Sequence, residues 1–352
     1  MWTATADKEL KKAFDDAIEI AYGNGRNGEL ENLANLFGDI ALDNYQQALL
    51  KGLDGGSNAA VDVAWIDKRP IAKLSATATG AELGDMMLVV HEHDPRGLQV
   101  SRACLLEVKQ SPGGAIPPVP VTGGESTRNQ FQILSSWPTL YGLKATGSNR
   151  AYLLENIITQ PGAATGGVLA QAWYVAVKPP STTAPTPMPW MAAPAAAGAP
   201  FEHTLGEIFG ACARGGSLTN TKVGAPIGVG RQFEEGKTLQ NPPGWDALIN
   251  AIISVTIFYD LPKHYFPHRA GRRYIPGRRF APLAAFCGLN IPSGAIPTAT
   301  GVLIGILIAC VAAAIFMRRK AGKHAPAQDD AFPVLFLNVH HSENMEPAGE
   351  RG

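Results

Sequence analysis

Apolar residues recur every three or four positions near the start of the chain, and this spacing is typical of helices with one buried face. The pattern predicts helices over residues 7–21 and from about residue 29 to residue 50, and Asn27 can cap the second one. Shorter apolar runs rich in β-branched residues predict strands. Further elements are expected as strands at 60–66 and 168–177 and as helices at 126–135, 201–213 and 245–259.

The segment 82–110 carries the clearest strand pattern and predicts a β-hairpin. The unbroken apolar run 86–90 follows Gly84-Asp85, which is typical of a short buried strand. The sequence 94–97, Asp-Pro-Arg-Gly, has proline second and glycine fourth, as type I turns prefer. A second apolar run then reaches residue 110. Two strands around such a turn form a hairpin.

Charged side chains gather at the open end of this hairpin. Because side chains alternate between faces, Leu105, Glu107 and Lys109 share one face of the second strand. One position of the turn pairs Asp85 with Leu106, and a shift or bulge of one residue brings Asp85 beside Glu107. Two carboxylates and an ammonium are therefore expected to converge there.

Such a group of charges requires partners, because burying an unpaired charge is costly. Two neighbouring carboxylates also repel each other, which raises the pKa of one of them unless a cation lies between. A divalent metal ion with oxygen ligands is the natural cation. The simpler alternative is a salt-bridged surface hairpin, against which Leu105, Leu106 and Val108 indicate burial.

The arrangement resembles the PD-(D/E)xK nuclease superfamily, with Asp85 at the start of one strand and Glu107-Val108-Lys109 on the next. The resemblance covers about residues 29–143, and Gly84 stands where the family's proline would be. It implies a restriction-endonuclease-like α/β (α+β) fold, a mixed central sheet flanked by helices. It also implies that Asp85 and Glu107 hold Mg²⁺ (or Mn²⁺) and that Lys109 joins them as a catalytic residue in DNA hydrolysis.

Two glutamates and two glutamines also match positions that some members of this family use. An early-helix glutamate often joins the family's metal site, so Glu29 and Glu31 are candidates, although acidic residues also favour a helix N-terminus on electrostatic grounds alone. A downstream glutamine contacts the site in some members. Gln130 and Gln132 are available, but a helical glutamine is more often a solvated residue, so neither is assigned to the site.

Composition restricts the possible classes of protein. The chain has 352 residues, 45% of them hydrophobic and 17% charged, which excludes broad disorder. The formal net charge is zero, so any footprint for DNA must be local. Four cysteines lack CxxC spacing, which gives no zinc signature and fits a reducing compartment. The start of the chain has no apolar segment typical of a signal peptide.

One segment, residues 263–279, provides a local basic footprint. It interleaves five arginines with three aromatic residues. Arginine beside aromatic rings suits a phosphate backbone with stacked bases. It equally suits an anionic membrane surface, or a loose surface segment without a specific ligand.

The run 301–317 is uncharged and apolar and is followed by Arg318-Arg319-Lys320. With residues 298–300 it reaches the roughly 20 residues that span a bilayer. It predicts a transmembrane helix, and the alternative is a helix buried in a soluble core. The following tail, 318–352, is expected to be polar and flexible.

We therefore expect a metal-dependent DNA nuclease in the cytoplasm, anchored to a membrane by its C-terminal helix and serving defence against foreign DNA. A second copy of the chain or a defence-system protein is the expected protein partner. The alternative is a non-catalytic, membrane-anchored binding or scaffold protein. The expected divisions are a nuclease-like domain (1–178), a Pro/Ala-rich linker or insertion (179–200), a helical part (201–262), a basic segment (263–297), a membrane helix (298–317) and a polar tail (318–352).

Overall fold

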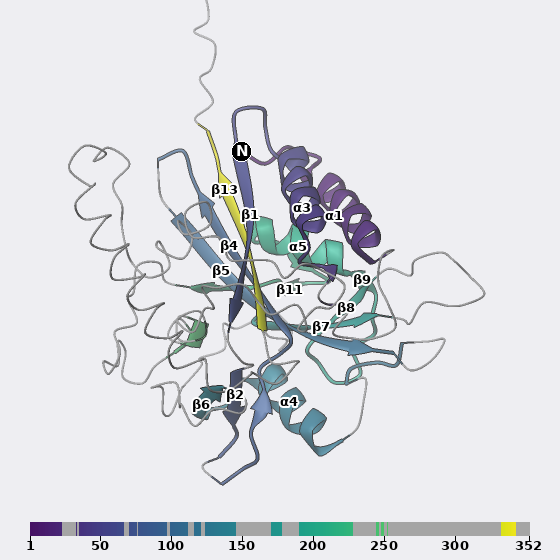
Figure 1. Cartoon of the computed structure of the whole chain (residues 1–352), viewed down its shortest axis with the longest axis vertical. Coiled ribbons are helices and arrows are strands. Elements are labelled where there is room, and N and C mark those ends of the chain that lie inside the picture. Colours follow the sequence, from purple (N-terminus) through teal and green to yellow (C-terminus); the bar gives the residue numbers. More distant parts are fainter. Residues whose placement is uncertain are drawn as a thin grey trace, which may run out of the picture.

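A computed structural model shows a central mixed sheet of eight strands flanked by helices (Figure 1). The strands lie in the order β1-β13-β4-β5-β7-β8-β9, and β12 pairs with part of β5. This confirms a mixed α/β fold with helices on a central sheet. The structure describes residues 1–22, 33, 35–66, 70–75, 77–96, 99–111, 116–120, 124–145, 170–177, 190–227, 244–245, 248–249, 252 and 332–342.

The strands of the central sheet are β1 (Asn58–Ile66), β4 (Met86–His93), β5 (Gln99–Gln110), β7 (Ala172–Val177), β8 (Met191–Pro194), β9 (His203–Thr204), β12 (Ala225–Ile227) and β13 (Phe332–His340). Two smaller sheets contain β2 (Pro70–Lys73), β3 (Ala81–Glu82) and β6 (Tyr141–Ala145), and β10 (Ser217–Leu218) with β11 (Thr221–Lys222). The helices are α1 (Ala6–Tyr22), α3 (Asp39–Gly52), α4 (Glu125–Ser136) and α5 (Leu205–Arg214).

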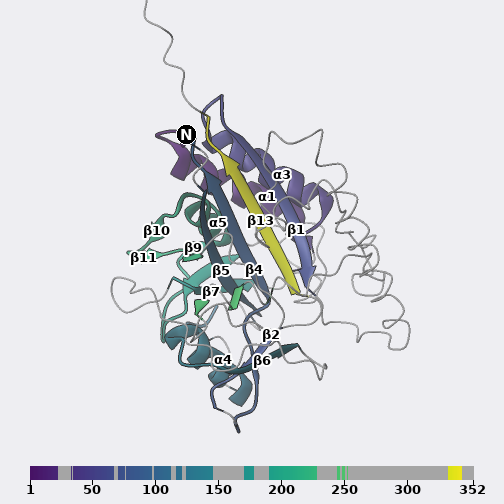
Figure 2. The same cartoon turned by 90° about the vertical axis from the view of Figure 1, so that its left-hand side faces the viewer.

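The C-terminal strand β13 lies inside the sheet, between β1 and β4 (Figure 2). It runs antiparallel to β1 and parallel to β4, with Leu337 opposite Val61 and Val90. Its side chains from Phe332 to Val339 are buried. The expectation of a polar, flexible tail after residue 317 is therefore wrong for 332–340, because this run supplies the backbone partners of two other strands.

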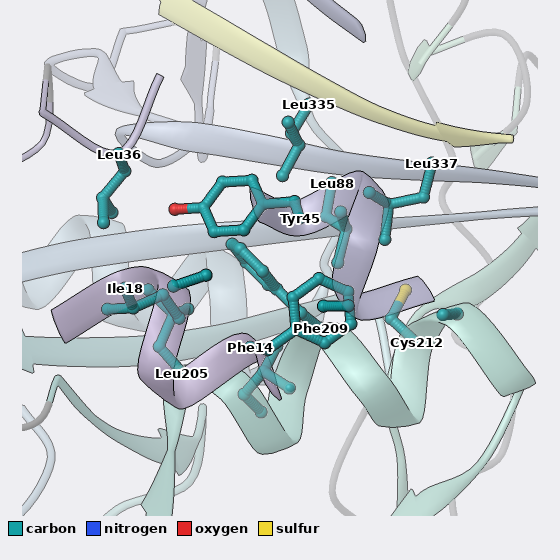
Figure 3. Packing of buried hydrophobic residues seen from close by; sticks show 14 of the residues in the cluster. Phe14, Ile18, Leu36, Tyr45, Leu88, Leu205, Phe209, Cys212, Leu335 and Leu337 are labelled. Carbon is teal, nitrogen blue, oxygen red and sulfur yellow. The ribbon is translucent and has the colours of Figure 1, made fainter. Parts of the chain in front are cut away.

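Helices α1, α3 and α5 cover one face of the sheet (Figure 1). Phe14 of α1, Tyr45 of α3 and Phe209 of α5 meet edge to face or tilted, with ring centroids 5.5 to 6.0 Å apart (Figure 3). Leu335 and Leu337 of β13 point into the same core. Aromatic pairs in these orientations add to the stabilisation that burial already supplies.

The opposite face packs on α4 and the small sheet of β2, β3 and β6 (Figure 2). Met87 and Leu105 of the hairpin contact this second core, which also contains Ile133 of α4 and Trp137, the residue after that helix. Trp245, which lies with its ring centroid 5.1 Å from that of Trp137, belongs to it as well. Asp85, Glu107 and Lys109 belong to this face, because side chains alternate along β4 and β5.

The sheet runs across the expected boundaries at residues 179 and 201. β7 pairs with β8, and Trp190, Ala192 and Ala193 are buried, so the second half of the Pro/Ala tract is part of the core rather than a linker. Helix α5 packs on α1 and is capped by Thr204, whose hydroxyl donates to Asp15 Oδ2 of α1 at 2.9 Å. The helical part after residue 201, for which packing on the nuclease-like domain was considered from the sequence, therefore joins the N-terminal region through α5.

Several expectations fall on other parts of the chain. Residues 29 and 31, the basic segment 263–297 and the predicted membrane helix 298–317 lie outside the described residues. Within the described part, no helix is long and apolar enough to span a membrane.

A polar cluster holds the end of β13 against the hairpin. Glu92 accepts hydrogen bonds from Trp2 Nε1 and His341 Nε2, each at 2.8 Å, and pairs with Arg102. Burial alone would raise the pKa of Glu92, but the hydrogen bond from His341 and the charge of Arg102 outweigh it and lower this pKa. The carboxylate therefore stays ionised, and it links β4, β5, the N-terminal residues and the residue after β13.

If β13 is a structural strand, shortening one of its core side chains should destabilise the whole domain. Leu337→Ala removes a fully buried side chain, so we expect a loss of about 2–5 kcal/mol in the free energy of unfolding. Urea unfolding followed by circular dichroism measures it. Val100→Thr, at an exposed β5 position, is the control and should change stability by less than about 0.5 kcal/mol. Equal small effects would contradict the central position of β13.

Candidate functional site

The hairpin has the register that brings Asp85 beside Glu107. Met86 pairs with Leu106, so the next position on each strand holds the two carboxylates. The amide of Asp85 donates to the Leu106 carbonyl at 2.9 Å, and Asp85 Oδ2 accepts from the Val108 amide at 2.8 Å. The one-residue shift considered from the sequence is therefore the observed pairing, and not the pairing of Asp85 with Leu106.

Gly84 explains the departure from the family pattern. Its φ is +123°, and a Cβ at this position would lie 3.0 Å from the Leu106 carbonyl oxygen. Proline fixes φ near −65° and cannot take this conformation. The chain thus needs glycine where the resembled family has proline, because the backbone before Asp85 turns close against β5.

Glu107 is fully buried, and two side chains contact its carboxylate. Its Oε2 accepts a hydrogen bond of 2.5 Å from Gln130 Nε2, and its Oε1 pairs with the ammonium of Lys109. Gln130 also donates to the Glu82 carbonyl at 3.2 Å, which ties α4 to β3. The expectation that Gln130 is a solvated helix residue is wrong, since it is buried and fixes one oxygen of Glu107.

The charges around Glu107 conflict. Burial raises the pKa of Glu107 well above its usual value, and the negative charge of Asp85 raises it further. Lys109 opposes both effects, and Glu82 adds a smaller repulsion. Carboxylates this close, in a site with little exposure to water, favour the binding of a proton or a cation.

Tyr174 is a site residue that the sequence did not indicate. β7 runs parallel to β5 with Tyr174 opposite Glu107, and the Tyr174 ring lies against Phe131 of α4 with centroids 6.3 Å apart. Its hydroxyl is buried and has no hydrogen-bond partner among the described residues. A strand at 168–177 was predicted, but its pairing with β5 joins distant parts of the chain and leaves no local sequence signal.

Asp85 and Glu107 are the residues expected to bind a metal ion, which requires oxygen ligands in sufficient number. In the part of the chain that the structure describes, no three or more histidine, cysteine, aspartate or glutamate side chains are grouped to hold a metal ion. Asp85 and Glu107 offer two carboxylates. Mg²⁺ commonly binds through one or two carboxylates and completes its shell with water and substrate phosphate. The two residues therefore fit such an ion.

Comparisons of the chain with protein-family models, with curated proteins and with solved structures found no match.

The conflict of charges at Glu107 predicts a pH dependence of stability. A carboxyl whose pKa is higher in the folded state binds its proton more tightly there, so stability falls as pH rises above about 4.5. Glu107→Gln keeps the shape and removes the ionisation. In metal-free protein, we expect the stability of this variant relative to wild type to increase between pH 5 and pH 8, measured by urea unfolding. A constant difference would contradict the raised pKa.

Proposed function

We propose that the protein is a metal-dependent nuclease that hydrolyses phosphodiester bonds of DNA, with a restriction-endonuclease-like core. The observation that carries the proposal is the meeting of Asp85, Glu107 and Lys109 at the open end of one buried hairpin. Two acidic groups and one ammonium are the residue types that metal-assisted phosphate hydrolysis needs. The resemblance of Asp85 and Glu107-Val108-Lys109 to the PD-(D/E)xK pattern supports the same reaction.

Each residue has a distinct role in this proposal. Asp85 and Glu107 would hold Mg²⁺ or Mn²⁺, which lowers the pKa of an attacking water and polarises the phosphate when bound. Lys109 would stabilise the negative charge that develops on the phosphate in the transition state. Gln130 holds Glu107 in place through the bond to Oε2, and the Val108 amide does the same for Asp85.

The second candidate is a binding or scaffold protein in which the site is purely structural. One observation favours it: Lys109 and Gln130 contact both oxygens of Glu107, as the partners of a structural ion pair would. In this case the group is a buried ion pair that costs about as much to desolvate as its attraction returns. Metal binding separates the two candidates, because only the nuclease needs it.

The nuclease proposal predicts cleavage of DNA that depends on Mg²⁺ or Mn²⁺ and stops with a chelator. Lys109→Ala should lower the rate on the order of 10²-fold or more, as removal of a transition-state donor does elsewhere. Asp85→Asn should also lose metal binding, measured with Mn²⁺. The control is Lys12→Ala, which removes an exposed lysine of α1 and should cut like wild type. Unchanged cleavage in both site variants would exclude this site.

We also propose that residues 301–317 attach the nuclease to a membrane from the cytoplasmic side, where its DNA substrate would be, in defence against foreign DNA. The described strands restrict how this can happen. β13 lies between β1 and β4. One sheet therefore combines strands from before residue 228 with a strand from after residue 331. A single crossing would carry β13 to the other side. Any insertion must therefore return, for example through the second apolar stretch, 281–292.

This arrangement predicts that tags at the two ends of the chain are accessible from the same side. In membranes extracted with carbonate the protein should stay in the pellet, and protease should remove both tags only from the cytoplasmic side. Ala312→Arg should shift protein to the soluble fraction, because an arginine at the centre of an inserted segment costs about 2.5–3.5 kcal/mol. Full release of wild type by carbonate would end the membrane proposal.

A further inference from the structure

We propose that Tyr174 is a positioning residue of this site, whose phenol O–H donates a hydrogen bond to an oxygen ligand of a cation held by Asp85 and Glu107. The oxygen is that of a water molecule or of a substrate phosphate. The inference rests on the proposed nuclease function, and it adds a donor from a third strand to the two strands of the hairpin.

The register places Tyr174 at the carboxylates. β5 and β7 are parallel neighbours, and Glu107 and Tyr174 are direct partners in that pairing. Partners across a sheet point to the same face, which here is the face of α4 and the second core. Asp85, directly before β4, therefore lies at one level of the sheet with Glu107 of β5 and Tyr174 of β7.

Tyr174 differs from Asp85 and Glu107 in that its polar atom has no hydrogen-bond partner among the described residues. Asp85 accepts from Val108, and Glu107 is bound by Gln130 and Lys109. The Tyr174 hydroxyl is completely buried, yet no described residue donates to it or accepts from it. A buried hydroxyl without a partner is destabilising, and a phenylalanine would fill the same space without that cost. Because Tyr174 also lies opposite Glu107, its hydroxyl is available to a ligand at the two carboxylates.

The phenol is a suitable donor for this position. Tyrosine is neutral at physiological pH, and burial together with the charges of Glu107 and Asp85 raises the pKa of Tyr174 further. It therefore keeps its proton beside two carboxylates. Unlike Lys109, it brings no positive charge that would compete with a cation for them. It can donate to a bound oxygen and leave the negative charges to the metal.

The test uses Mn²⁺ alone as the probe, with the full chain and no DNA. Binding is measured by electron paramagnetic resonance of free Mn²⁺, in wild type, Asp85→Asn and Tyr174→Phe. We expect Asp85→Asn to lose the site and Tyr174→Phe to weaken it on the order of 10-fold, the usual effect of removing a group that orients a metal ligand. Tyr45→Phe is the matched control, a buried tyrosine on the opposite face of the sheet.

A second measurement separates positioning from a structural role. If the hydroxyl serves only a bound ligand, Tyr174→Phe should unfold in urea at the same or a higher concentration than metal-free wild type. Lower stability with unchanged Mn²⁺ affinity would make Tyr174 a packing residue and overturn the inference. Binding that depends on Asp85 but not on Tyr174 would leave the nuclease site standing without it. No Mn²⁺ binding by wild type would overturn both.

Discussion

The pairing of β13 with its two neighbours is the interaction on which the rest of the structure depends. β13 hydrogen-bonds to β1 along one edge and to β4 along the other. Without it, two long strands would expose unpaired backbone groups, which are costly to bury and prone to pair with other chains. Helix α3 packs on β1, α5 packs on β4 and β5, and α1 lies against both helices, while Leu335, Leu337 and Val339 of β13 belong to the same core.

The two faces of the sheet have different tasks as a consequence. The face under α1, α3 and α5 is apolar at nearly every position and supplies most of the stabilising burial. The other face contains Glu107 and Asp85 between apolar neighbours such as Met87 and Leu105. Lys109 and Gln130 offset part of the desolvation of the buried Glu107 carboxylate. The burial of apolar side chains under α1, α3 and α5 stabilises the fold enough to offset the cost of burying Glu107 beside Asp85 on the other face.

Local signals predicted the hairpin and its acidic pair, since both depend on residues close in sequence. The apolar runs, the turn at 94–97 and the alternation of side chains were enough to bring Asp85 to Glu107 within one residue of register. Helix α1 and strand β1 were also found within two residues of their bounds.

The remaining elements depend on pairings between distant residues. Tyr174 reaches the site through the parallel pairing of β7 with β5, and Gln130 through the packing of α4, and neither leaves a local pattern. The strand at 332–340 did leave one, the short apolar run from Val334 to Leu337, which is typical of a buried strand. This run is short and lies between polar stretches, so the composition of 318–352 as a whole indicates a polar tail.

Buried ionisable groups lie at both ends of the sheet face that packs on α4. Through them, the stability of the fold depends on pH in opposite directions. At the end away from the carboxylates, burial lowers the pKa of His91 to about 3, with contributions from His93 and His340, whose rings stack with centroids 4.4 Å apart. An imidazole whose folded pKa is depressed stabilises the fold above its unfolded pKa near 6.5, and this stability is lost as pH falls.

Glu107 acts in the opposite direction, because its raised pKa makes the folded state less stable as pH rises above about 4.5. The stability of the metal-free fold therefore falls in both directions of pH, through the buried histidines as pH falls below about 6.5 and through Glu107 as pH rises above about 4.5. A cation between Asp85 and Glu107 would remove only the second penalty. The charge arrangement that weakens the metal-free fold at neutral pH is thus the one through which a cation would stabilise it.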